Sequence, residues 1–234
     1  MRNFRILAAL GLLGAATVAN AGVSSTWTLT NDYDFRGNSQ SAKDPAVQGS
    51  VDYAADSGWY LGAWGSNVDF GAADVDLEVD LYTGFAGESE GGLGYDVGVV
   101  YYAYPDESDF NYFEAYGSVS KDWFKGKLWF SNDFGGDSTP GDTEGFYLEA
   151  NGTFPLPQNF SVLAHVGYSW GDYWDAIGDE TIDYSLGVGY TINQFNLALK
   201  YVDTDTDAVV RDDVFNNEGR VIFTIATTFP WSAD

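Results

Sequence analysis

The sequence predicts an all-β fold: a single up-and-down antiparallel transmembrane β-barrel of about twelve strands, with ten or fourteen as the alternatives. Apolar and polar residues alternate with a period of two along most of the chain, as expected for strands with one polar face. The alternating segments are mostly about 10–12 residues long, which suits a tilted strand crossing a bilayer and exceeds the usual soluble strand. Aromatic residues make up 17% of the chain, which has 28 glycines and no cysteine.

Residues 1–21 have the pattern of a secretory signal peptide. Two arginines form a positive start, Ile6–Val18 is uncharged and mostly apolar, and Ala19-Asn20-Ala21 is a small-x-small cleavage site. The apolar run is too short to cross about 30 Å of hydrocarbon as a helix. We therefore expect export and cleavage, which leaves 22–234 as the barrel.

Turn residues divide the rest of the chain into strands. The stretch 74–85 shows the pattern: the even positions from 74 to 80 are all acidic, whereas the odd positions from 75 to 81 are Val or Leu. Helical spacing of apolar residues is absent, so essentially no helix is expected. The twelve expected strands are 26–36, 45–54, 59–68, 74–85, 93–104, 110–121, 127–134, 145–154, 160–170, 182–192, 195–204 and 219–229.

The connections between these strands tend to alternate in length. The first, third, fifth, seventh, ninth and eleventh are longer on average than the five between them. An outer-membrane barrel with an even number of strands has this arrangement, with short periplasmic turns and longer outer loops.

A soluble barrel would show the same alternation, with the apolar face inward. Twelve closed strands enclose more space than these side chains fill, and the polar face is rich in Gly and Ser, which suits a crowded lumen. Aromatic residues near the strand ends are expected to form girdles at the headgroup level. The expected girdle residues are Trp27, Phe35, Trp59, Tyr101, Trp123, Phe134, Trp170 and Phe229.

Composition excludes several classes of function. A formal net charge of −25 argues against nucleic-acid binding. Without cysteine there are no disulfides, thiolate metal sites or cysteine nucleophiles. The single histidine, His165, has no Gly-x-Ser-x-Gly motif to accompany it. We therefore expect no catalytic residues, no resident metal and no cofactor, and we treat an outer-membrane hydrolase as a minor alternative.

Two blocks near the start of the barrel, Tyr33–Gln40 (YDFRGNSQ) and Asp44–Gly49 (DPAVQG), resemble the opening of the TorF-family porins of proteobacteria. Further blocks agree along nearly the whole chain, among them Trp64–Phe70 and Tyr101–Pro105. The resemblance implies an outer-membrane barrel of porin type in a Gram-negative bacterium. It offers no functional residues to carry over.

The charged face predicts how such a barrel would act. A surplus of carboxylates in a water-filled lumen favours cations. We expect passive diffusion of ions or small polar solutes, with outer-membrane lipid and lipopolysaccharide as the surroundings. The alternative is a structural or surface-interaction barrel, plugged by pairing of the acids with the bases and without transport. The expected lumen-lining residues are Asp32, Asp34, Arg36, Asp74, Asp76, Glu78, Asp80, Asp96, Glu114, Glu149, Asp183, Lys200 and Arg220.

Overall fold

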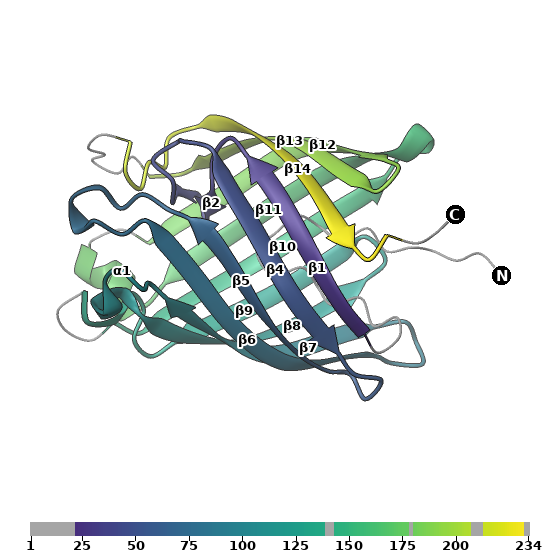
Figure 1. Cartoon of the computed structure of the whole chain (residues 1–234), viewed down its shortest axis with the longest axis horizontal. Coiled ribbons are helices and arrows are strands. Elements are labelled where there is room, and N and C mark those ends of the chain that lie inside the picture. Colours follow the sequence, from purple (N-terminus) through teal and green to yellow (C-terminus); the bar gives the residue numbers. More distant parts are fainter. Residues whose placement is uncertain (1–21, 139–142, 178–179, 207–212, 232–234) are drawn as a thin grey trace.

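The computed structural model describes residues 22–138, 143–177, 180–206 and 213–231, and in them the chain forms one closed antiparallel barrel of twelve strands (Figure 1). Each strand pairs with its neighbours in sequence, and β1 closes the ring by pairing with both β4 and β14. The predicted fold class and strand number are confirmed. The signal peptide expected over 1–21 lies outside the described residues.

Nine of the wall strands begin and end within two residues of the predicted bounds, whereas the strands predicted over 26–36, 74–85 and 127–134 are each shifted by three residues or more. Segments 160–170 and 195–204 have the predicted bounds. The twelve wall strands are β1 (Gly22–Thr30), β4 (Ala46–Ala54), β5 (Trp59–Asn67), β6 (Leu77–Glu88), β7 (Gly94–Ala103), β8 (Tyr112–Lys121), β9 (Phe124–Ser131), β10 (Gly145–Pro155), β11 (Phe160–Trp170), β12 (Thr181–Ile192), β13 (Phe195–Thr204) and β14 (Arg220–Phe229).

Connections alternate in length more clearly than the sequence suggested. The five short ones, which have two to five residues, lie at the right-hand end of the barrel in Figure 1. The six long ones lie at the other end and carry all but one of the minor elements. These are the two-residue strands β2 (Asp34–Phe35) and β3 (Asn38–Ser39), the helix α1 (Asp172–Ile177) and the 3-10 turns η1 (Gly71–Ala73), η2 (Ser108–Phe110), η3 (Gly136–Ser138) and η4 (Pro157–Asn159), of which η4 alone lies in a short connection. None of the described helices is long and apolar enough to cross a membrane.

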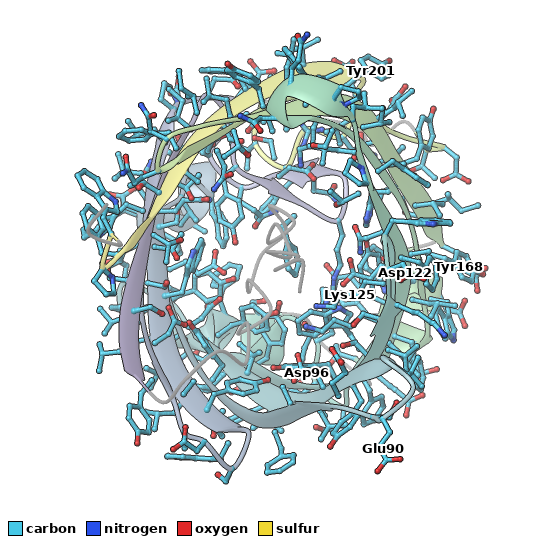
Figure 2. The ribbon with its side chains drawn as sticks, turned by 90° about the vertical axis from the view of Figure 1, so that its right-hand side faces the viewer. Glu90, Asp96, Asp122, Lys125, Tyr168 and Tyr201 are labelled. Carbon is cyan, nitrogen blue, oxygen red and sulfur yellow. The ribbon has the colours of Figure 1, made fainter. Side chains whose placement is uncertain are left out.

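The two faces of the wall have opposite character, in the orientation that the sequence predicted. On β6, Leu77 and Leu81 are 43% and 53% exposed, whereas Glu78 and Asp80 between them are 2% and 1% exposed. Figure 2 shows the same division along the barrel axis: Asp96 and Lys125 point inward, and Tyr168 and Tyr201 point away from the barrel. The outside of the barrel is therefore apolar and the inside is polar and charged.

An aromatic cluster also lies inside the barrel, towards the long connections. Its wall members come mainly from β7 to β10 and include Tyr102, Tyr116, Trp129 and Tyr147, all buried. Segments from the long connections pack against them, which places a second, partly apolar core within the charged lumen. This inner core was not among the features predicted from the sequence.

Candidate functional site

Residues 31–45, here called the inner segment, leave the wall after β1 and fold into the lumen. They correct the prediction of a strand over 26–36, because β1 ends at Thr30. Arg36 and Gly37 both have positive φ, 51° and 83°, and form the two-residue turn of the β2–β3 hairpin. In Figure 2 this purple hairpin lies within the ring of wall strands.

The inner segment contacts opposite sides of the barrel. Arg36 pairs with Glu114 on β8, and Asp32 pairs with Arg220 on β14, six strands away around a ring of twelve. Tyr33 donates to Glu78 on β6, while Gly37 packs against Asp183 on β12, which is again six strands away. The inner segment therefore bridges the lumen along two diameters.

Arg36 makes the most enclosed ion pair of the inner segment. Its Nη2 lies 2.7 and 2.8 Å from the two oxygens of Glu114, to which Tyr102 also donates at 2.9 Å. The guanidinium stacks over four rings, including Phe35 at 4.6 Å and Tyr147 at 4.4 Å. Burial by itself would lower the pKa of Arg36, but the Glu114 carboxylate outweighs it and the pKa lies above its ordinary value. Arg36 therefore stays charged.

A second pairing holds the base of the hairpin. Arg220 Nε donates to Asp32 at 2.5 Å, its Nη2 pairs with Asp34, and its Nη1 donates to the carbonyl of Gly37 at 2.8 Å. Ser39 adds a bond to Asp32 at 2.5 Å. Burial raises the pKa of Asp34, an effect that Arg220 opposes. One wall arginine thus holds two carboxylates and a backbone carbonyl of the inner segment.

A further set of polar wall residues, on β9 to β12, lies beside the inner segment. His165 Nε2 lies 2.8 Å from Asp183, to which Tyr147 also donates, and His165 Nδ1 lies 2.8 Å from the Asn151 carbonyl oxygen. Trp129 and Asn151 donate to Glu149 at 2.8 and 2.7 Å. The histidine is held by hydrogen bonds on both ring nitrogens, which fits a structural role in the wall.

Other predicted lumen residues are found inside the barrel but away from these pairs. Asp96 accepts from Tyr60 at 2.6 Å. Lys200 lies on the inner face of β13, where a side chain at the facing Gly187 would collide with it. Lys127 is not among the predicted site residues, yet its Nζ lies over the rings of Tyr116 and Trp129, 3.6 Å from each ring centre.

Two of the predicted lumen residues lie neither in a wall strand nor in the inner segment. Asp74 and Asp76 were expected inside a strand over 74–85, but β6 starts at Leu77, and both are exposed in the connection 68–76. Asp74 has a φ of 56° and ends the turn η1, a left-handed conformation that a strand does not tolerate. The alternation of acidic and apolar residues thus begins before the strand itself does.

Two of the predicted girdle residues point inward. Phe35 lies in β2 within the lumen, and Phe134, placed at the end of a predicted strand 127–134, lies beyond β9 and is buried. Both rings contact Arg36 inside the lumen. An aromatic residue at the end of an alternating segment can therefore pack inside the barrel and need not face the lipid. The others lie on outward-facing wall positions or in the turn between β8 and β9: Trp27, Trp59, Tyr101, Trp123, Trp170 and Phe229.

A signal for the inner aromatic core was present in the sequence. On β8, Tyr112, Glu114 and Tyr116 are two residues apart and therefore share one face of the strand, and all three are buried on the inner face. Aromatic residues on the acidic face of a barrel strand indicate that something packs against that face.

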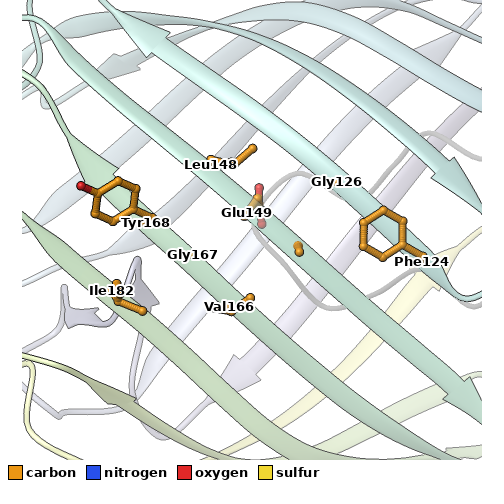
Figure 3. A pocket seen from close by; sticks show the side chains of 9 residues that line it. Phe124, Gly126, Leu148, Glu149, Val166, Gly167, Tyr168 and Ile182 are labelled. Carbon is orange, nitrogen blue, oxygen red and sulfur yellow. The ribbon is translucent and has the colours of Figure 1, made fainter.

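A shallow apolar groove on the outward surface is shown in Figure 3. It lies over β9 to β12, where Gly126 and Ala150 leave room between Phe124, Leu148 and Val166. Because this groove faces away from the lumen and its lining is almost entirely apolar, it suits a hydrocarbon chain better than a polar solute.

The fold is similar to those of solved outer-membrane channels. The KdgM porin has a TM-score of 0.57 at 8% identity, with 89% of this chain and 99% of that porin covered. The NanC porin has a TM-score of 0.58 at 10% identity, with 89% and 100% covered. The COG4313 outer membrane channel from Pseudomonas putida F1 has a TM-score of 0.50 at 12% identity, with 89% and 94% covered. At such identities the likeness shows the fold alone.

No curated protein matches the chain in sequence. A family model, described as a bacterial protein of unknown function (Gcw_chp), matches residues 15–229. With its porin-like barrel, the chain belongs to the Gcw_chp family of bacterial proteins of unknown function.

Proposed function

We propose that the protein is a porin-like channel of the Gram-negative outer membrane, through which ions or small polar solutes diffuse passively. One observation carries the proposal: a closed barrel with an apolar outside and a charged inside is narrowed by an inner segment held to opposite walls. Lipid and lipopolysaccharide would surround its apolar face, and a signal peptide over 1–21 would direct export. The resemblance to the TorF-family porins agrees with this proposal.

We further propose a preference for cations. Inward acids outnumber inward bases, and within the described residues Asp80, Asp96 and Asp183 form no ion pair with an arginine or a lysine. Such a surplus attracts cations and repels anions within a low-dielectric wall. The KdgM porin has been solved in complex with disordered oligogalacturonate, a carboxylate sugar. For this chain, the surplus of carboxylates argues against an anionic solute of that kind.

Planar-bilayer recording of the refolded protein tests both statements. With a potassium chloride gradient across the bilayer, we expect discrete conductance steps and a reversal potential of the sign that potassium movement gives. Folding is checked on gels, because a folded barrel migrates differently with and without boiling. A folded barrel that does not conduct contradicts the channel, and a reversal potential of the opposite sign contradicts cation preference alone.

A plugged barrel without transport is the second candidate, and the pairing itself favours it. The ion pairs of Arg36 and Arg220 hold the inner segment across the lumen, and the aromatic core fills part of the same region. If the plug is complete, the folded wild type will be silent in the bilayer, and shortening the inner segment between Asn31 and Pro45 will produce conductance. A conducting wild type contradicts this candidate.

A further inference from the structure

Glu78 and Asp80 on β6 form a buried pair of carboxyl groups. The two side chains are 2% and 1% exposed, and both face the lumen side of the wall. Glu114 has Arg36, and Asp32 and Asp34 have Arg220, but no ion pair is formed by Glu78 or Asp80 within the described residues. Two neighbouring carboxylates are thus enclosed without an opposing charge.

Their hydrogen bonding is also incomplete. Both oxygens of Asp80 and the Oε2 of Glu78 are buried and accept no hydrogen bond from any other group in the described part of the chain. The two carboxyl groups lie within hydrogen-bonding reach of each other. Tyr33 donates to the other oxygen of Glu78 at 3.2 Å. Burial raises the pKa of the Tyr33 hydroxyl well above its ordinary value, so Tyr33 is a neutral donor and brings no compensating charge.

Such an arrangement requires either a proton shared by the two carboxyl groups or a bound cation. An unpaired buried carboxylate is expensive to hold, and two of them repel each other as well. The unsatisfied atoms are all carboxylate oxygens, which hard cations such as Ca²⁺ and Mg²⁺ prefer as ligands. A divalent ion would match the two negative charges, and Ca²⁺ also tolerates the irregular geometry of two strand residues.

We propose that Glu78 and Asp80, beneath Tyr33 of the inner segment, form a binding site for a hard divalent cation such as Ca²⁺. Because no group of three metal-binding side chains converges among the described residues, water supplies the other ligands. The bound ion joins the wall to the inner segment through Glu78 and Tyr33. This site belongs to the folded barrel and does not depend on whether the barrel conducts.

Terbium luminescence gives a direct test, because Tb³⁺ is a hard ion that occupies calcium sites and emits when nearby aromatic rings are excited. Tyr33 touches the carboxylate pair, and the Trp64 ring lies 5.5 Å from the Tyr33 ring. We expect saturable, sensitised emission from the folded barrel in detergent, and its displacement by Ca²⁺.

The double variant Glu78→Gln, Asp80→Asn keeps the shape of both side chains and removes their charge. We expect it to bind Tb³⁺ and Ca²⁺ more weakly by more than about tenfold. The matched control is Asp74→Asn, Asp76→Asn, which removes two exposed acids just before the same strand and should bind like the wild type. Gel migration with and without boiling confirms that all three proteins are folded.

Equal binding by the wild type and the Glu78, Asp80 variant overturns the proposal, as does a folded wild type without sensitised emission. In the latter case the carboxylate pair is held by a proton, and the wild type should show an infrared band of a protonated carboxyl that the double variant lacks. Conductance is measured separately: a silent barrel that binds Ca²⁺ refutes the channel and supports the site, and a conducting barrel that binds none does the opposite.

Discussion

Arg36 shows how much a single side chain decides in this barrel. It is 9% exposed, it is paired with Glu114, and it stacks on rings from the inner segment, from β9 and β10, and from the connection 132–144. A planar guanidinium can donate to a carboxylate in its own plane while its faces lie against aromatic rings. An ammonium group has no such flat faces. Arg36 therefore joins the inner segment to one side of the barrel, as Arg220 joins it to the other.

Replacing Arg36 with Ala should release the inner segment. Glu114 would then be buried without its counter-charge, and breaking a buried pair in this way costs about 3–5 kcal/mol. We expect a lower midpoint of unfolding in urea and a larger, noisier bilayer conductance than in the wild type.

The matched variant is Arg36→Lys, which keeps the charge and loses the stacking and part of the pairing. It should fall between the wild type and the Ala variant in both measurements. If Arg36→Ala conducts and unfolds like the wild type, the pairing does not hold the inner segment.

At the scale of elements, the inner segment depends on a turn that only a small residue can form. Gly37 has a φ of 83°, and a Cβ at this position would lie 2.8 Å from the Cβ of Asp183 and closer still to Thr204. Both the backbone conformation and the space therefore require glycine.

Gly37→Ala should displace the hairpin from the wall at β12 and β13. We expect altered conductance and reduced protection of the inner segment against proteolysis from the side of the long connections. Gly92→Ala is the control, because Gly92 also has a positive φ, 73°, but nothing lies within 4 Å of its added Cβ. If the two variants behave alike, backbone strain rather than the contact with the wall is responsible.

The inner segment also explains why the strand predicted over 26–36 is wrong at its C-terminal end. Alternation continues through Tyr33, Asp34 and Phe35, so the sequence predicts one strand over 26–36 where the chain in fact ends β1 and turns inward. Beyond β9 the pattern likewise continued into Phe134. Period-two alternation identifies residues that share a face, but it does not show whether the wall or the lumen provides their neighbours.

At the scale of the whole molecule, the exposed apolar surface is the feature that places the barrel in a bilayer. Large hydrophobic side chains are exposed on every wall strand described, including Leu29, Leu81, Leu128 and Leu199. A surface of that kind on a soluble monomer would promote aggregation.

Leu81→Arg tests this placement, since Leu81 lies in the middle of β6. A cation at the middle of a bilayer costs about 2–4 kcal/mol, whereas near the interface the cost is about 0–1 kcal/mol. Leu93→Arg, in the short connection before β7, is therefore the control. We expect Leu81→Arg to lower the stability of the barrel in lipid vesicles by the larger amount, measured by urea unfolding; equal effects would contradict the membrane placement.

The sequence by itself predicted the class of fold and about twelve strands, because these follow from local alternation and from turn residues. It predicted an apolar outer face from the number of strands, the small residues on the polar face and the aromatic residues at the strand ends. It also grouped the acids of β6, β8 and β12 on one face. Only the tertiary structure decided that residues 31–45 fold inward, that Arg36 pairs with Glu114 and Arg220 with Asp32, and that Glu78 and Asp80 form no ion pair within the described residues. These contacts join strands on opposite sides of a closed ring, and no local pattern specifies which residues will meet across it.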